Sequence, residues 1–216
     1  MKKIKWCLIA VISVMLIFSF SGCGEKFDPV AYVQGNFDLF FHGEASEEFV
    51  DSLEDVETVD ELKAEYNEIV DFFTDETINS LSMDTVDDNV RNDLHQMYVA
   101  LLDASKYEIT GNYSENNDEY EVEVIAYPLE TYNDVINDED GTLTAKAEEA
   151  ITADASYDEI MATYIGIMAK EVESALADPT YGEPKTYNIR VFVDEDGYYT
   201  VDEDQIADIT GFLLGE

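Results

Sequence analysis

The chain of 216 residues holds only two cysteines, Cys7 and Cys23. Cys7 lies inside an N-terminal apolar run that we expect to be cut off, so the exported polypeptide keeps one cysteine. One cysteine excludes an intramolecular disulfide, a cysteine-based zinc site and a thiol pair. Stability must come from the core alone, and the roughly 190 residues left after cleavage suffice for one sizeable domain.

Basic residues are also scarce, with 11 Lys and Arg against 50 Asp and Glu, a net charge of −39. Removal of residues 1–22, which hold Lys2, Lys3 and Lys5, leaves 8 basic residues against the same 50 acidic ones, a net charge of −42. Such a surface repels nucleic acid and anionic lipid headgroups, so we expect no nucleic-acid partner. It attracts cations and basic partners without specificity.

The N-terminus has the three parts of a secretory signal: basic residues, an apolar run over 6–20, and the small residues Ser21 and Gly22. The run of about 15 residues is shorter than the about 20 that span a bilayer comfortably. The sequence therefore predicts a cleaved signal in place of a membrane-spanning anchor.

Phe20-Ser21-Gly22-Cys23 resembles the lipobox of bacterial lipoproteins, although Leu is more usual at the first position. The resemblance implies cleavage before Cys23, diacylglycerol on its sulfur, and often a further acyl chain such as palmitate on the new amino group. Two or more chains hold a protein stably on a membrane. The alternative is a secreted protein in which Cys23 is incidental.

These features predict a lipid-anchored protein on the outer face of the bacterial cytoplasmic membrane, with Cys23 as the lipidation site. The expected organisation is a signal peptide over 1–22, a lipidated tether over 23–27 and a single extracytoplasmic domain over 28–216.

The first part of the domain has helical spacing of apolar residues. Asp28 and Pro29 are typical of a helix start and Gly43 of its end. A second helix is expected from Ser46, a third from Thr58, where Glu61 completes a capping box, and a fourth over 86–105.

The spacing then changes to alternation. Strands are predicted over 107–113, 119–127, 185–193 and 198–201, the last two joined by a turn at Asp196-Gly197. Between the pairs we expect a short helix over 129–136 and a long helical region over 144–177, with a break near Asp154; a last helix is capped by Asp202. The prediction is an α+β domain in which N-terminal helices and one long central helix pack on an antiparallel sheet of about four strands, after an N-terminal signal helix.

No catalytic constellation can be identified. The chain lacks a nucleophile elbow and phosphate-binding glycine loops, and we interpret His42 and His95 as structural or surface residues. The carboxylates of 137–141 and 194–197 match no EF-hand, and their Asp-Gly pairs are typical of turns. We expect no metal site and no cofactor, with weak calcium binding at the surface left open.

Aromatic residues are plentiful, with 14 Tyr and 11 Phe. Several could line a pocket with tyrosine hydroxyls at its rim, but core filling is the favoured interpretation. The residues concerned are Phe37, Phe40, Phe41, Tyr120, Tyr187, Tyr198 and Tyr199. The ligand-binding residues are unknown at this stage.

Short stretches along the chain resemble a group of small, uncharacterised lipoproteins of Gram-positive bacteria. They are Phe20-Ser21-Gly22-Cys23-Gly24, Phe27-Asp28-Pro29-Val30-Ala31-Tyr32-Val33, Tyr181-Gly182-Glu183-Pro184, Asp196-Gly197-Tyr198-Tyr199 and Asp204-Gln205-Ile206. The resemblance implies an NTF2-like or cystatin-like α+β fold, from which the helical region over 144–177 departs. It transfers no functional residue except Cys23.

We therefore expect a non-enzymatic binding or interaction module of the cell envelope, with a small ligand or an envelope protein as partner. The alternative is a hydrolase that acts on glycan through carboxylates. Such an enzyme requires a carboxyl group in a cleft with its pKa raised above the ordinary value.

Overall fold

The computed structural model describes residues 27–53, 58–81, 83, 86–116, 119–194 and 197–215. The predicted signal peptide, and Cys23 with most of the tether, lie outside these residues. The helices are α2 (Pro29–His42), α3 (Glu47–Ser52), α4 (Val59–Ser80), α5 (Asp88–Asp103), α6 (Glu130–Asn137), α7 (Thr142–Ala150), α8 (Tyr157–Leu176) and α9 (Glu203–Leu213). The strands are β1 (Lys106–Asn116), β2 (Glu119–Tyr127), β3 (Lys185–Val193) and β4 (Tyr199–Val201).

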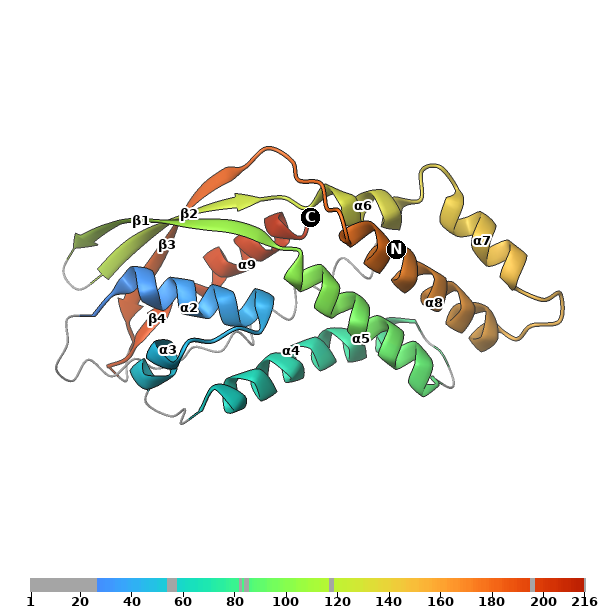
Figure 1. Ribbon diagram of the computed structural model, residues 1–216, viewed down its shortest axis with the longest axis horizontal. Helices are drawn as coiled ribbons and strands as arrows, with labels where there is room; N and C mark the ends of the chain where they lie inside the picture. The colour runs from blue at the N-terminus through green and yellow to red at the C-terminus, as the bar shows by residue number, and fades with distance from the viewer. Residues whose placement is uncertain are drawn as a thin grey trace.

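The four strands form one open antiparallel sheet in the order β1-β2-β3-β4. Helices α2 and α9 lie against it, α4 lies alongside α2 on the side away from the sheet, and α5, α7 and α8 extend the molecule away from the sheet (Figure 1). The predicted α+β class and the four antiparallel strands are confirmed.

The long helical region expected over 144–177 needs a correction. It is divided into α7 and α8, and the break over 151–156 includes Asp154, where a break was predicted. The main contacts of α8 are with α5, α6 and α7, whereas α2 and α9 are the helices that contact the strands most. One long central helix on the sheet was therefore the wrong expectation, because a second capping box at Ser156 and Glu159 starts a separate helix.

Local chemistry explains the predicted helix boundaries. The Asp28 carboxylate accepts hydrogen bonds from the Val30 and Ala31 amides at the start of α2. The Thr58–Glu61 capping box opens α4 as predicted. Gly43 ends α2 with φ +62°, and a Cβ there would meet the Tyr66 ring at 2.8 Å, so only glycine fits.

Strand β1 contains an irregularity that the alternation did not predict. The pairing with β2 shifts between Ile109 and Tyr113, at Gly111 with φ +76°. The side chains of Thr110 and Asn112 both donate to Glu123 across the shift. Such a bulge bends the strand and increases its twist, and here it lies four pairs from the end of the hairpin.

Phe27 is already part of the core. Its side chain is 7% exposed and stacks on Tyr199 with ring centroids 3.6 Å apart and planes within 5°. It also touches the rings of Tyr32 and Tyr120. Sequence reasoning assigned Phe27 to the tether, but the packed structure includes it.

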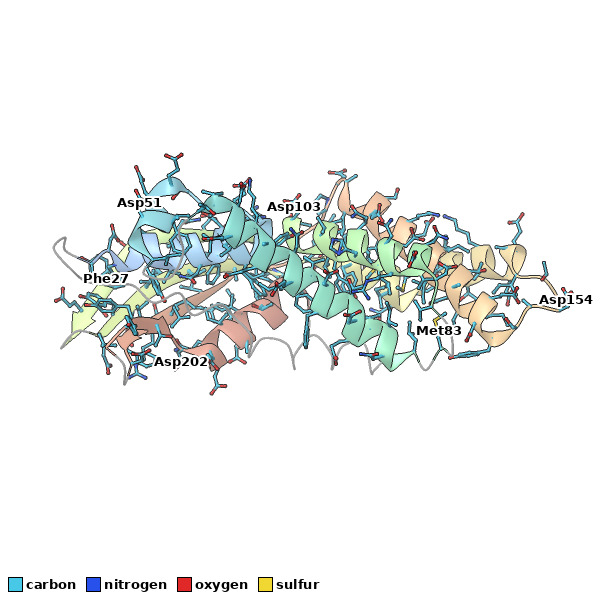
Figure 2. All side chains as sticks on the ribbon, turned by 90° about the horizontal axis from the view of Figure 1, so that it is seen from below. Phe27, Asp51, Met83, Asp103, Asp154 and Asp202 are labelled. Carbon is cyan, nitrogen blue, oxygen red and sulfur yellow. The ribbon has the colours of Figure 1, made fainter. Side chains whose placement is uncertain are left out.

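The molecule therefore has two ends. We call the end with Phe27, β4 and the β1–β2 hairpin the sheet end, and the end with the α4–α5 and α7–α8 connections the helical end. Figure 2 shows Phe27 near one end and Asp154 at the opposite tip, with Met83 between Asp103 and Asp154 in the helical part.

Candidate functional site

An apolar cleft of about 310 Å³ lies at the helical end, between the last turn of α4 and the first half of α8. Its lining residues are Thr77, Leu81, Ile151, Ile160, Met161, Tyr164, Ile165 and Met168. Thr77, Ile165 and Met168 are buried, while the other five are only half-buried. The Thr77 hydroxyl shares a hydrogen bond with the Tyr98 hydroxyl, so the floor of the cleft presents no unpaired polar group there.

The edge of the cleft is held by Tyr157, the first residue of α8. Its hydroxyl donates to the Leu81 carbonyl at 3.1 Å and so ties the start of α8 to the end of α4. Its side chain is nevertheless 56% exposed. The cleft thus has a fixed frame and an accessible aromatic residue beside it.

The sequence analysis did not identify this cleft. A signal was present, because Ile160, Met161, Tyr164 and Ile165 form an apolar stripe wider than one packed face requires. Ile151 adds to it from the break between the helices. The pattern could not show which part of this apolar stripe on α8 is left uncovered by α4 and α5.

In two further hollows, most of the charged lining residues are acidic. One of about 680 Å³ lies between α2, α3 and the start of α4, and its lining includes Asp28, Asp38, Glu44 and Glu48 with the basic Lys63. The other, of about 540 Å³, lies between α6, α7 and α8. Its lining residues are Asp134, Val135, Asn137, Asp138, Glu139, Asp140, Thr142, Leu143, Glu171, Ser174 and Ala175.

The carboxylates of the 137–141 loop serve the start of α7. Asp138 accepts from the amides of Leu143 and Thr144 and from the Thr144 hydroxyl, and Asp140 accepts from the amide and hydroxyl of Thr142. These hydrogen bonds lower the pKa of both carboxyl groups. For Asp138 the bond from the Thr144 hydroxyl has the largest effect.

The other acidic loop, over 194–197, forms a turn in which Asp194 accepts from the Tyr198 amide. Glu195 and Asp196 are outside the described residues. Among the residues that are described, no group of three or more His, Cys, Asp or Glu is arranged to hold a metal ion.

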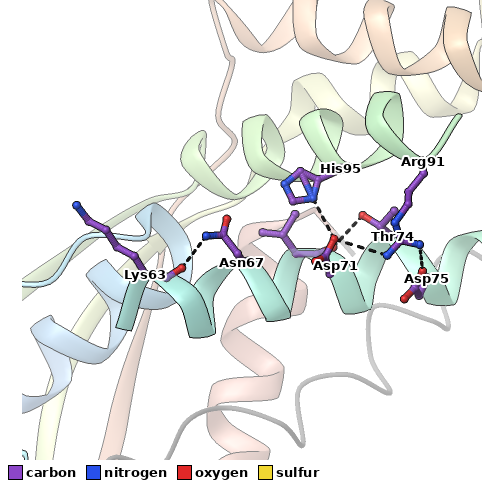
Figure 3. A network of polar contacts seen from close by, with 8 residues as sticks. Lys63, Asn67, Asp71, Thr74, Asp75, Arg91 and His95 are labelled. Atoms are coloured by element: carbon purple, nitrogen blue, oxygen red, sulfur yellow. Dashed lines mark hydrogen bonds and ion pairs between the residues drawn. The ribbon is translucent and has the colours of Figure 1, made fainter. Parts of the chain in front are cut away.

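Both histidines lie beside a carboxylate between packed elements. Figure 3 shows His95 and Arg91 on α5 facing Asp71 on α4, with His95 Nδ1 3.4 Å from an Asp71 oxygen and Arg91 3.6 Å from it. Arg91 also binds Asp75. His42, at the end of α2 as expected, lies 3.6 Å from Asp103 and stacks on Tyr107. These contacts join helices to their neighbours, in keeping with the structural interpretation.

The aromatic residues considered as pocket lining are mostly core residues. Phe37, Phe40 and Phe41 are buried on the inner face of α2. Phe37 and Phe41 pack against Tyr107 there. Tyr120 and Tyr199 belong to the Phe27 cluster, and Tyr187 packs on Phe212. Tyr198, half-buried, precedes β4. Core filling was the favoured interpretation, and it describes these contacts.

Burial raises the pKa of the Glu65 carboxyl group on α4, with Glu68 and Glu61 adding to the effect by repulsion. Its Oε2 atom is buried and has no hydrogen-bond partner. Glu65 is not among the lining residues of the three hollows described above. The carboxyl group with a raised pKa, that of Glu65, therefore lies outside the apolar cleft and the two other hollows.

Of the helices that the structure describes, none has the length and apolar character needed to cross a membrane. Cys23 itself lies outside the described residues, so its surroundings form no part of the site.

Comparison with known proteins gives one structural relative to report. No family model matches the chain, and no curated protein sequence does. The fold is similar to the crystal structure of a candidate lipoprotein, YcdA, from Bacillus subtilis, with a TM-score of 0.56 at 14% sequence identity. The match covers 87% of this chain and 56% of that one, so this chain spans little more than half the length of its structural relative. At this identity the similarity extends to the fold alone.

Proposed function

We propose that the protein is an envelope lipoprotein, anchored through Cys23 to the outer face of the cytoplasmic membrane, and that its domain is a non-enzymatic binding module. The lipobox-like residues 20–23 support the anchor, and the likeness of fold to a candidate lipoprotein is consistent with it. The NTF2-like or cystatin-like relationship stays a prediction.

The observation that carries the proposal is the position of Phe27. This residue is fixed in the aromatic cluster only four residues after Cys23. At 3.3–3.6 Å per residue, the chain between them reaches at most about 14 Å. A lipid on Cys23 would hold the sheet end next to the bilayer, and the helical end would project away from it.

The anchor is tested by labelling cells with a palmitate analogue. We expect Cys23→Ala to abolish labelling, because alanine has no sulfur atom to carry the diacylglycerol. Cys7→Ala is the matched control and should label as the wild type does, because Cys7 leaves with the signal. Undiminished labelling of Cys23→Ala would refute the anchor, and a protein recovered with a free Cys23 thiol would favour simple secretion.

The glycan hydrolase is the competing function, and among the described residues Glu65 is the carboxyl group with the raised pKa that the acid role requires. The position of Glu65 outside the described hollows favours binding over hydrolysis. We expect the full-length lipidated protein in detergent to release no soluble sugar from purified cell walls. Release that disappears in Glu65→Gln would establish the hydrolase instead.

A further inference from the structure

The cleft at the helical end exposes side chains that a folded domain normally covers. Leu81, Ile151, Ile160 and Met161 are half-buried around a buried floor, and the hollow is lined almost wholly by apolar groups. A concave and mostly apolar hollow is the usual form of a binding site in a folded domain.

We propose that the cleft binds the apolar side chains of a short, positively charged segment of another envelope protein. This inference rests on the proposed function in one respect, since the anchor at Cys23 is what directs the cleft away from the membrane and toward such a partner. The cleft and its charge are properties of the domain itself.

Charge decides between the possible occupants. The segments 76–81 and 151–168, which supply the lining, hold four carboxylates and no Lys or Arg. The carboxylates are Glu76, Asp154, Asp158 and Glu159. Arg91 on the neighbouring helix α5 is engaged with Asp71 and Asp75. These carboxylates are close in the chain to the lining residues, and a surface rich in carboxylates attracts a basic segment and repels a second copy of this strongly acidic chain.

Size and flexibility fit side chains better than a cofactor. A volume of about 310 Å³ is at the lower limit of ligand pockets, which run from roughly 300 to 1,000 Å³. It accommodates one or two large apolar side chains. Met161 and Met168 give the walls the adaptability that methionine gives to surfaces that bind varied sequences, and the ring of Tyr157 offers contact area at the edge.

The test uses the full-length lipidated protein in neutral detergent and three short synthetic peptides. The first has a Phe-Leu pair flanked by lysines, the second has the same pair flanked by glutamates, and the third has lysines around a Ser-Ser pair. Binding is measured by fluorescence anisotropy of labelled peptide at low and at physiological salt. We expect only the first peptide to bind, and more weakly as salt is added, because exposed charges are screened.

Ile160→Lys places a cation on the wall of the cleft and should weaken that binding by at least about tenfold, since it removes an apolar contact and repels the lysines. Val193→Lys is the matched control, because Val193 is an exposed aliphatic residue, 40% accessible, on β3 at the sheet end. It should leave the affinity unchanged. Circular dichroism of both variants verifies that they remain folded.

Three results would overturn the inference: no binding of the first peptide, equal binding of the glutamate-flanked peptide, or equal loss in Ile160→Lys and Val193→Lys. Equal binding of the glutamate-flanked peptide would point to an uncharged apolar ligand. The outcome is separate from that of the anchor, because the peptides are bound in detergent. A failed palmitate label leaves the cleft result standing, and a failed peptide assay leaves the anchor standing.

Discussion

The sheet end and the helical end handle their apolar side chains differently. At the sheet end, the ring of Phe27 stacks on Tyr199 and closes the core against β4. At the helical end, α4 and α8 diverge around a cleft whose apolar walls are only half-covered. The closed end is the one nearest to Cys23 in the sequence, and the open end is the one where apolar side chains stay accessible.

Removal of the Phe27 ring tests the closed end and should have the largest effect. Phe27→Ala leaves a cavity against Tyr199 and Tyr120, and we expect it to lower the free energy of unfolding by about 3 kcal/mol. Urea unfolding followed by circular dichroism measures the loss.

Phe72→Ala is the control, because Phe72 on α4 is 37% exposed. Its loss should be well under half that of Phe27→Ala. Similar losses of stability in the two variants would mean that Phe27 does not contribute to the core, and would contradict the closed sheet end.

Removal of a cap tests the open end and should have a smaller effect. Ser156 Oγ accepts from the Glu159 amide, and the Glu159 carboxylate accepts in return from the Ser156 amide, at the start of α8. Ser156→Ala should cost about 1 kcal/mol. The loss should appear first as faster amide exchange in the opening turn of α8, beside Tyr157.

The matched change on the same helix is Ser174→Ala, at an exposed interior position where alanine is at least as favourable as serine. It should leave both the stability and the exchange of α8 unchanged. If the two serine variants behaved alike, the capping box would contribute nothing to the frame of the cleft.

Acidification should produce the smallest difference in stability between the two ends. Hydrogen bonds lower the pKa of Asp138, Asp140 and Glu159, all at helix starts toward the helical end. A lowered folded pKa gives stability that is complete above the ordinary values of 3.8 and 4.5 and is lost as the pH falls through the folded pKa. As the pH falls below the ordinary values, the starts of α7 and α8 should therefore lose exchange protection progressively.

The central strands β2 and β3 provide the internal reference, since the general relief of carboxylate repulsion on acidification acts on both ends. Their one acid with a lowered pKa is Glu119, which is held by Arg190 at the rim of the sheet. Amide-exchange protection factors are measured at about pH 3 and about pH 6, and at each pH the values for the starts of α7 and α8 are divided by those for β2 and β3. A ratio that does not change with pH would show that the capping bonds are not what holds the helical end.

Local signals in the sequence predicted most element boundaries. Asp28 and Thr58 act through groups within three residues, and Gly43 closes the last turn of its own helix, so these signals could be read directly. The bulge at Gly111 was missed because Tyr107 to Tyr113 alternates well enough to imitate a regular strand. The division of α7 from α8 was half-predicted, from the break near Asp154, without the capping box at Ser156.

The candidate site was much less predictable. Most of the aromatic residues considered as pocket lining pack within the core, as the contact between Phe41 and Tyr107 shows. The cleft residues Ile151 and Ile160 looked like ordinary core positions. A hollow depends on how far neighbouring helices diverge, and no periodicity within one helix contains that information.

The sequence alone determined the strong negative charge, the signal and lipobox pattern that make Cys23 the predicted anchor, and the succession of helices and strands. Each of these follows from composition or from residues close together in the chain. Only the tertiary structure decided that Phe27 closes one end of the core while Leu81 and Ile160 border a cleft at the other. These features join residues far apart in the sequence, and whether an apolar side chain is covered depends on packing between elements.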